Sequence, residues 1–257
     1  MTDARAYYNE HDAFAAAWLR ELIAEGLIAA GDVDERDIQH VSAADLLGYT
    51  QCHFFAGIGG WSYALRLAGW PDERPVWSGS CPCQPLSIAG RRQGHADERH
   101  LWPAFHRLIA ERRPAVVFGE QVASPDGREW LSGLRADLEG DGYAVGAANL
   151  TAAGCGAPQR RARLWWVADA DHARRQGRER QRQSHPPGPR WPAARREPVR
   201  SDCGPWPPGP GAVDRIPLQP HGIPNVVGKM RGYGNAIVPQ VAAQFIGAYL
   251  DLEPVTP

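Results

Sequence analysis

The sequence has one lysine, no long apolar run and almost no net charge. Of its 28 positively charged residues only Lys229 is a lysine, and 29 acidic residues leave a formal charge of −1. This balance excludes a uniformly basic coat for nucleic acid, whereas the arginine excess fits either GC-rich coding or guanidinium contacts to phosphates and base edges. No apolar run reaches the roughly 18 residues of a membrane helix, and no signal-peptide pattern opens the chain. We therefore expect a cytoplasmic protein without membrane contacts.

Cysteine is also scarce, and its spacing argues against two common uses. Five cysteines cannot all pair, and Cys81 and Cys83 are too close for a routine disulfide, which fits a reducing compartment. A Cys-x-Cys pair without a second pair nearby is a poor zinc site, so we expect no metal. A special cysteine in this chain is then a reactive one, and a buried structural cysteine is the alternative.

Short strands alternate with amphipathic helices over residues 1–168. The expected strands are residues 6–8, 52–56, 75–80, 115–118 and 164–168, and the expected helices are residues 14–23, 61–69, 101–112 and 130–138. Asp12 is placed to cap the first helix. This alternation predicts an α/β fold with a mostly parallel, doubly wound, Rossmann-like sheet covered on both faces.

The composition changes after Ala168. Eleven of the 23 prolines lie between Pro186 and Pro220, and nine arginines lie between residues 169 and 203. Regular core strands do not tolerate proline at this density. Two interpretations stay open for this segment: a low-complexity insert, or a small arginine-bearing surface that meets nucleic acid. A helix carrying Val241 and Phe245 is expected to follow.

Two loops that follow predicted strands have residues suited to ligand binding or catalysis. Residues 57–60 read Gly-Ile-Gly-Gly between a strand and a helix, which is typical of a nucleotide-binding loop but also common without a ligand. Cys83 follows the next predicted strand, and ligands of open α/β sheets bind beyond the carboxyl ends of strands. A thiol there, near a helix N-terminus and arginines, can ionise and act as a nucleophile.

Charged residues stand beside two later strands. Glu120 ends the strand that begins at residue 115, and a carboxylate at that place is costly unless it is used or paired in a cap or salt bridge. Gln159, Arg161 and Arg163 alternate just before the last strand, so their side chains are expected to point the same way. The alternative for these three is a solvated edge.

In this order the motifs resemble the DNA (cytosine-5) methyltransferase family. The matching segments are residues 55–60, 82–85, 87–101, 120–122, 159–163 and 234–235. The resemblance implies the fold of S-adenosylmethionine-dependent methyltransferases, S-adenosyl-L-methionine as cofactor and double-stranded DNA as substrate. It also implies a place in restriction-modification or in a phage or prophage, with a companion restriction endonuclease on another chain. We expect a monomer.

The resemblance also implies roles for individual residues. Cys83 is the nucleophile that attacks C6 of a flipped cytosine, Glu120 holds N3 and the exocyclic amine, and Arg161 and Arg163 hold the O2 side. The residues implied for the cofactor are Glu10, His11, Asp37, Phe55, Gly57, Ile58, Gly59, Gly60, Pro82 and Asn235. Those implied for DNA are Gln84, Ser87, Arg91, Arg92, Arg99 and Gln159. Residues 87–99 are expected to close over the base.

Two cofactor elements that the family places between the glycine loop and the cysteine are missing there, because only residues 71–80 separate the helix from Cys81. Residues 7–12 resemble the first, with Glu10 on the ribose, and residues 36–38 resemble the second, with Asp37 on the adenine. We therefore predict a permuted order. The helix after the glycine loop would keep its place while residues 69–75 bend beneath the sheet. The competing interpretation is a true loss of both contacts.

The resemblance divides the chain into three parts. Residues 1–168 form the catalytic domain, with permuted cofactor-binding elements in residues 1–48. Residues 169–224 form a short target-recognition region rich in arginine and proline, and residues 225–257 return to the catalytic domain.

Several departures from the family pattern keep other functions open. The departing residues are His11, Arg36, His53, Leu86 and Gln121. The alternatives are a cytosine-5 methyltransferase acting on tRNA or using an altered cofactor, and an inactive DNA-binding relic. An unrelated cysteine hydrolase would need His95 or His100 as its base, and neither has a recognisable triad context.

Overall fold

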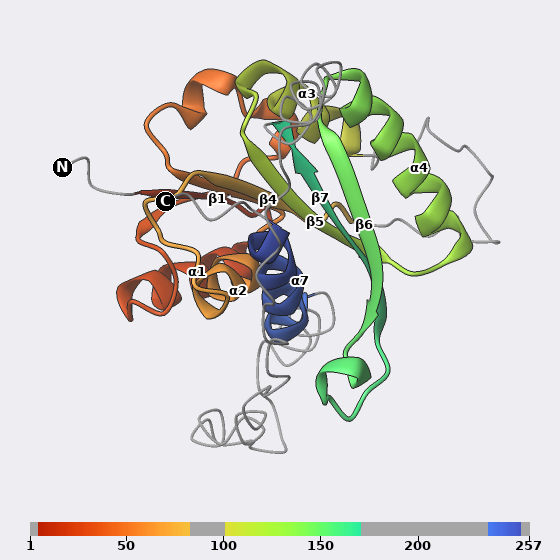
Figure 1. Ribbon diagram of the computed structural model, residues 1–257. Helices are drawn as coiled ribbons and strands as arrows, with labels where there is room; N and C mark the ends of the chain where they lie inside the picture. Colours follow the sequence, from red (N-terminus) through yellow and green to blue (C-terminus); the bar gives the residue numbers. More distant parts are fainter. Residues whose placement is uncertain (1–4, 83–100, 171–235, 253–257) are drawn as a thin grey trace, which may run out of the picture.

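The computed structural model describes residues 5–82, 101–170 and 236–252, which form a mixed seven-stranded sheet between two layers of helices (Figure 1). The strands are β1 (Ala6–Asn9), β2 (Gly31–Asp34), β3 (Gln51–Phe54), β4 (Val76–Gly79), β5 (Val116–Val122), β6 (Ala144–Thr151) and β7 (Ala162–Asp169). Their order across the sheet is β2-β1-β3-β4-β5-β7-β6. Strands β1 to β5 are parallel, and β7 runs antiparallel to both of its neighbours. The predicted α/β, mostly parallel fold is confirmed.

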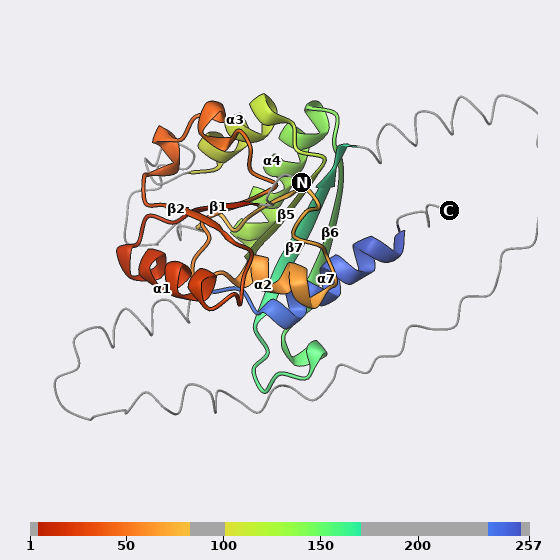
Figure 2. The ribbon, with the colours of Figure 1, turned by 90° about the vertical axis from the view of Figure 1, so that its left-hand side faces the viewer.

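Helices cover both faces of the sheet (Figure 2). One face carries α1 (Ala13–Ala24), α2 (Gly60–Leu67) and α7 (Pro239–Leu252), and the other carries α3 (Trp102–Arg112), α4 (Pro125–Gly140) and the 3-10 turns η1 (Ile38–His40) and η2 (Ala43–Leu46). Alternate strand residues supply the two cores: Val117 packs with α3 and α4, whereas Val116 and Phe118 pack with α2 and α7. The sheet is therefore doubly wound, as predicted.

Local signals account for most element boundaries. The carboxylate of Asp12 accepts hydrogen bonds from the backbone N–H groups of Phe14 and Ala15, so it caps α1 as predicted. Helix α4 begins at Pro125, five residues before the predicted start, because the Ser124 hydroxyl caps it and proline suits the first turn. Strand β6 was not among the predicted elements.

The connection through α2 differs in hand from those through α1 and α3. Helix α1 leads from β1 to β2, and α2 leads from β3 to β4 in the opposite direction across the sheet, yet both lie on one face. Helix α3 leads from β4 to β5 in the same direction as α2 but on the other face. Since parallel crossovers are nearly always right-handed, the α2 connection is the exceptional one. This is the placement that the predicted permutation requires, and the permutation itself stays a prediction.

The segment after α2 is anchored under the sheet. Gly69 takes a positive φ of 77°, and the Trp70 side chain is buried beneath β5 against Phe118. The Arg74 guanidinium lies 3.8 Å from the Trp70 ring centroid, and the Gln51 amide donates to the carbonyl of Pro71. These contacts let the chain enter β4 without placing α2 on the opposite face. In the described part of the chain, no helix has both the length and the apolarity to span a membrane.

Candidate active site at the carboxyl edge of the sheet

Five parallel strands deliver their following loops to one edge of the sheet. Glu10 follows β1, the turn at residues 35–37 follows β2, and the glycine loop at residues 55–59 follows β3. Residues 80–82 follow β4, and β5 ends in residues 120–122. Ligands of open α/β sheets bind at this edge. Most of the predicted site residues within the described ranges therefore share one edge.

The glycine loop has the backbone shape that a ligand cradle needs. Phe55, Gly57 and Gly59 all have positive φ, at 52°, 56° and 79°. A Cβ added at Gly57 would meet no atom within 4 Å, so open space lies beside it. Gly60 differs, because its Cβ would lie 2.7 Å from Cγ1 of Ile237. The structure thus gives Gly60 a packing role against the segment that enters α7.

Glu10 joins the end of β1 to the glycine loop. Its Oε2 accepts a hydrogen bond from the Gly57 backbone N–H at 2.7 Å, and its Oε1 accepts one from the Asp12 N–H at 2.9 Å. Asp37 stands at the start of η1, where its carboxylate accepts from the Gln39 N–H at 2.9 Å. His11 is exposed, and its Nδ1 lies 2.9 Å from the carbonyl of Glu35. The N-terminal elements therefore meet the glycine loop, as the predicted placement of Glu10 needs.

Glu120 forms a buried ion pair with Arg163. The side chains lie on the neighbouring strands β5 and β7, and Glu120 Oε1 is 2.7 Å from Arg163 Nε. Burial raises the pKa of Glu120 above its usual value, although the positive charges of Arg163 and Arg161 oppose the shift. Glu120 does not end its strand as predicted: β5 continues to Val122, because pairing with β7 extends through Arg163.

Arg161 has a different partner from Arg163. Its Nη2 donates to the carbonyl of Ala236 at 2.6 Å, which ties β7 to the segment before α7. Burial lowers the pKa of Arg161, and the nearby charge of Arg163 adds to that shift. Gln159 is exposed in the hairpin between β6 and β7, which reaches beyond the other strands (Figure 1).

Gln121 is one of the departures from the family pattern, and the structure shows what its side chain contacts. Its side chain is buried, and its amide nitrogen donates to the carbonyl of Cys81 at 3.3 Å while its amide oxygen accepts from the Val122 N–H. The Trp61 indole N–H donates to the Ser80 hydroxyl at 3.0 Å. The family usually has asparagine at this position. The longer side chain of Gln121 reaches the Cys81 carbonyl and so holds the segment that leads to Cys83.

The buried side chains of Cys52, Cys81 and His53 are uncharged near neutral pH. Burial raises the pKa of Cys81, and it raises that of Cys52 to about 12, so both thiols stay protonated near neutral pH. Burial lowers the pKa of His53 to about 3, so its imidazole is neutral, with Nδ1 2.8 Å from the Ser78 hydroxyl. These side chains serve the core.

Part of the predicted site lies outside the described residues. The residues concerned are Cys83, Gln84, Ser87, Arg91, Arg92, Arg99 and Asn235, together with Leu86, His95 and His100. Pro82 is the last described residue before the first gap, and it is exposed. Within the described ranges, no group of three or more His, Cys, Asp or Glu side chains is placed to hold a metal ion.

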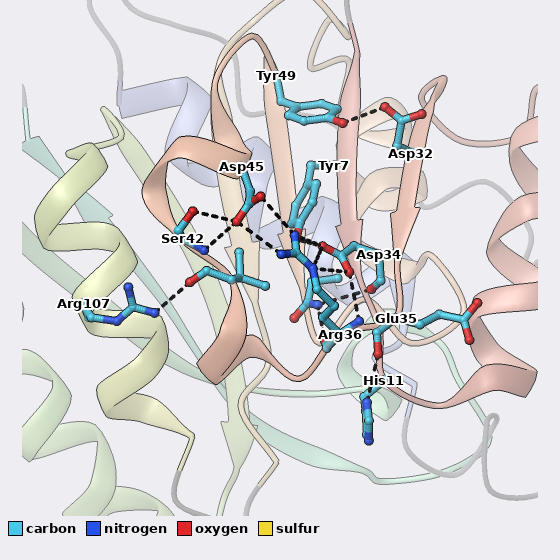
Figure 3. Close-up of polar contacts among 12 residues, drawn as sticks. Tyr7, His11, Asp32, Asp34, Glu35, Arg36, Ser42, Asp45, Tyr49 and Arg107 are labelled. Carbon is cyan, nitrogen blue, oxygen red and sulfur yellow. Dashed lines mark hydrogen bonds and ion pairs between the residues drawn. The ribbon is translucent and has the colours of Figure 1, made fainter.

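A polar network that no sequence pattern predicted lies beside β2 (Figure 3). The Asp34 carboxylate accepts from the Tyr7 hydroxyl at 2.6 Å and from Arg36 Nη2 at 2.6 Å. Burial alone would raise the pKa of Asp34, but these two partners lower it below its usual value. Asp45 accepts from the Ser42 hydroxyl and pairs with Arg36, and its pKa falls to about 2. The presence of Arg36 in place of the family's usual glycine was the one available signal.

A cavity of about 400 Å³ lies beside this network, away from the glycine loop. Its lining residues are Tyr7, Arg20, Asp32, Val33, Asp34, Glu35, Arg36, Asp45 and Tyr49. Each carboxylate in this lining already pairs with an arginine. The cavity is therefore an internally satisfied polar surface, and we assign no ligand to it.

Comparison with known proteins agrees with this geometry. The fold class is α/β and Rossmann-like, and residues 70–190 match the family model of the C-5 cytosine-specific DNA methylases. The matched stretch contains Cys83, Glu120, Arg161 and Arg163, and it begins after the glycine loop. The resemblance read from the motifs is therefore confirmed.

Individual relatives cover part of the chain. The Type II methyltransferase M.AplI of Arthrospira platensis is 36% identical over 104 residues, which are 40% of this chain and 29% of that protein. The Type II methyltransferase M.NlaX of Neisseria lactamica is 33% identical over 110 residues, which are 41% of this chain and 35% of that protein. The chain thus spans about a third of the length of these curated relatives.

Solved structures are more distant. The S. pombe Dnmt2 methyltransferase superposes with a TM-score of 0.40 at 14% identity, over 65% of this chain and 50% of that one. The Entamoeba histolytica methyltransferase EhMeth gives 0.41 at 16% identity, over 65% and 53%. A protein described as a DNA modification methyltransferase encoded within an E. coli prophage gives 0.40 at 14% identity, over 66% and 48%.

Proposed function

We propose that the chain is a DNA cytosine-5 methyltransferase, which transfers a methyl group from S-adenosyl-L-methionine to C5 of cytosine in double-stranded DNA. The observation that carries the proposal is the buried Glu120–Arg163 pair, 2.7 Å apart, at the carboxyl edge of the sheet. Both residues lie in the stretch that matches the cytosine-5 methylase model. A buried carboxylate and guanidinium at this edge suit a base that presents N3, an exocyclic amine and O2.

The residues of the glycine loop fit the cofactor. Space is open beside Gly57, the loop backbone takes positive φ at three positions, and α2 begins directly behind it. Glu10 and Asp37 would hold the ribose hydroxyls and the adenine amine, with Phe55 and His11 beside the adenine. When bound, S-adenosylmethionine supplies an electrophilic methyl group. The Glu10 carboxylate has lone pairs left for a diol, because each oxygen accepts one backbone N–H in the structure.

The chain's own residues would then activate the cytosine. The Cys83 thiolate forms a bond to C6, and the ring electrons move toward C5, which becomes nucleophilic enough to take the methyl group. A proton from Glu120 at N3 favours this electron flow, and Arg163 holds O2. Loss of the C5 proton to a base then forms the C5–C6 double bond, sulfur leaves C6 with the electron pair of its bond, and N3 returns its proton to Glu120. The target base must leave the duplex stack to be reached.

One segment of the chain would recognise the DNA sequence, and the rest would form the catalytic domain. Residues 169–224 would form the target-recognition region, with residues 1–168 and 225–257 as the catalytic domain. Arginines in the recognition region can contact guanine edges or phosphates. A companion restriction endonuclease would be a separate chain. The enzyme would act as a monomer on double-stranded DNA.

Expression in a host without cytosine methylation tests the function. We expect 5-methylcytosine at one recurring sequence in host DNA, detected by bisulfite sequencing, and none in the empty-vector control. Nucleoside analysis of tRNA from the same cells gives the opposing result. If 5-methylcytosine rises in tRNA and not in DNA, the substrate is RNA and the proposal is wrong. If the purified protein binds S-adenosylmethionine but modifies neither, the chain is an inactive relic.

Replacing Glu10 by alanine should weaken cofactor binding. Because a hydrogen bond to a charged group contributes about 1.5–3 kcal/mol, we expect the Kd for S-adenosylmethionine to rise about 10- to 100-fold. Isothermal titration calorimetry measures the change. Glu21→Ala is the matched control, since Glu21 is an exposed glutamate on α1. An unchanged Kd for Glu10→Ala would refute the permuted arrangement.

A further inference from the structure

We propose that Asn9 is a positioning residue, whose side-chain amide sets the spacing between the two carboxylates that would bind the cofactor. Asn9 is the last residue of β1 and directly precedes Glu10. It clamps the turn after β2, which carries Asp37. The inference rests on the proposed function, because that function gives Glu10 and Asp37 their ligand.

The clamp uses the whole donor capacity of the amide. Asn9 is 3% exposed, and its Nδ2 donates to the carbonyl of Arg36 at 2.8 Å and to that of Asp34 at 3.3 Å. An amide nitrogen has two hydrogens, and here each has a carbonyl acceptor. Two carbonyl oxygens that converge on one buried point require a donor between them. An apolar side chain or a carboxylate at this position would leave the Arg36 carbonyl without this donor and would leave the Asp34 carbonyl with the Glu10 N–H alone.

Backbone hydrogen bonds also connect Asn9 to the segment after β3. The Asn9 carbonyl accepts from the Ala56 N–H at 3.0 Å, at the start of the glycine loop. The Glu10 N–H donates to the carbonyl of Asp34 at 3.0 Å. Asn9 therefore lies where the ends of β1, β2 and β3 meet, and its side chain connects the β2 turn to the other two.

The opposite side of the turn is held by Arg36 (Figure 3). Its guanidinium pairs with the carboxylates of Asp34 at 2.6 Å and Asp45 at 3.3 Å, while its carbonyl accepts from the Asn9 amide. The turn is thus fixed from both sides, and Asp37 is its last residue. A ligand that needs two carboxylates at a set separation binds more tightly when both are held in advance.

Asn9→Asp is the sharpest test, because it keeps the shape of the side chain and removes both donors. We expect the Kd for S-adenosylmethionine to rise at least about tenfold, since the carboxylate would repel the two carbonyl oxygens. At saturating cofactor, kcat and the KM for DNA should stay within about twofold of the wild type, because Asn9 would act through cofactor binding only. Asn149→Asp is the control, since Asn149 is exposed on β6.

Asn9→Ser covers the case in which the aspartate variant fails to fold. Its hydroxyl retains one donor without a charge, so we expect a smaller rise in Kd, and thermal unfolding reports whether it is folded. If a folded variant binds the cofactor as tightly as the wild type, or loses kcat at saturating cofactor with an unchanged Kd, Asn9 has no positioning role. A wild type that binds no S-adenosylmethionine refutes the proposed function instead, and with it the role of Asn9.

Discussion

Replacing Cys83 by serine should abolish methyl transfer to DNA. A serine hydroxyl ionises far less readily than a thiol, so the bond to C6 would not form, and we expect the rate to fall at least about a thousandfold. Single-turnover transfer of a tritiated methyl group to a duplex bearing the target sequence measures the loss. Binding of S-adenosylmethionine should persist, because the proposed cofactor contacts come from Glu10, Asp37 and the glycine loop.

Cys81→Ser is the matched control for this prediction. Cys81 stands two residues earlier, is 5% exposed, and has a pKa raised by burial, so it lacks the properties of a nucleophile. A duplex with 5-fluorocytosine at the target adds a direct test, since fluorine at C5 blocks the elimination that frees the enzyme. We expect a denaturation-resistant complex with the wild type and with Cys81→Ser, and none with Cys83→Ser. A complex that forms with the wild type and with Cys83→Ser but not with Cys81→Ser would reverse the assignment.

The elements that the sequence predicted well have local causes. Asp12 at the start of α1 and the periodic apolar residues of α3 act within a few residues, so a single pattern identifies them. Strand β6 has only Val145 and Thr151 as β-branched residues and carries Gly146, Ala147 and Ala148 between them, and it forms because β7 pairs with it. The extension of β5 through Glu120 has the same non-local cause.

The candidate site also has features that the sequence predicts and features that depend on contacts between distant segments. The resemblance places Glu120 and Arg163 in one site, but only the register of β5 against β7 shows that they pair. The contact of Gly60 with Ile237 joins segments far apart in the chain, so a glycine loop read alone looks like a pure ligand cradle. Asn9 lies in the segment that resembles the family's first cofactor element, but no role was predicted for its side chain, because its partners are backbone carbonyls, which no sequence pattern distinguishes.

Replacing Glu120 by glutamine should slow methyl transfer while leaving the site assembled. Glutamine can still donate to N3 and accept from the exocyclic amine, but it cannot deliver a proton, so we expect kcat to fall about 100- to 10,000-fold. The Kd for S-adenosylmethionine should not change. Glu139→Gln is the control, because Glu139 pairs with Arg135 at 2.6 Å on the exposed face of α4. Equal losses in both variants would show a general effect of removing a glutamate–arginine pair.

The pH dependence of the same variant separates proton delivery from simple hydrogen bonding. Burial raises the pKa of Glu120, so its protonated form persists to higher pH than that of an exposed glutamate. If that form donates to N3, single-turnover rates of the wild type should decline as pH rises through the raised pKa of Glu120. Glu120→Gln cannot ionise, and its low rate should therefore lack this decline. A parallel decline in both proteins would mean that another group sets the pH dependence and that Glu120 does not deliver the proton.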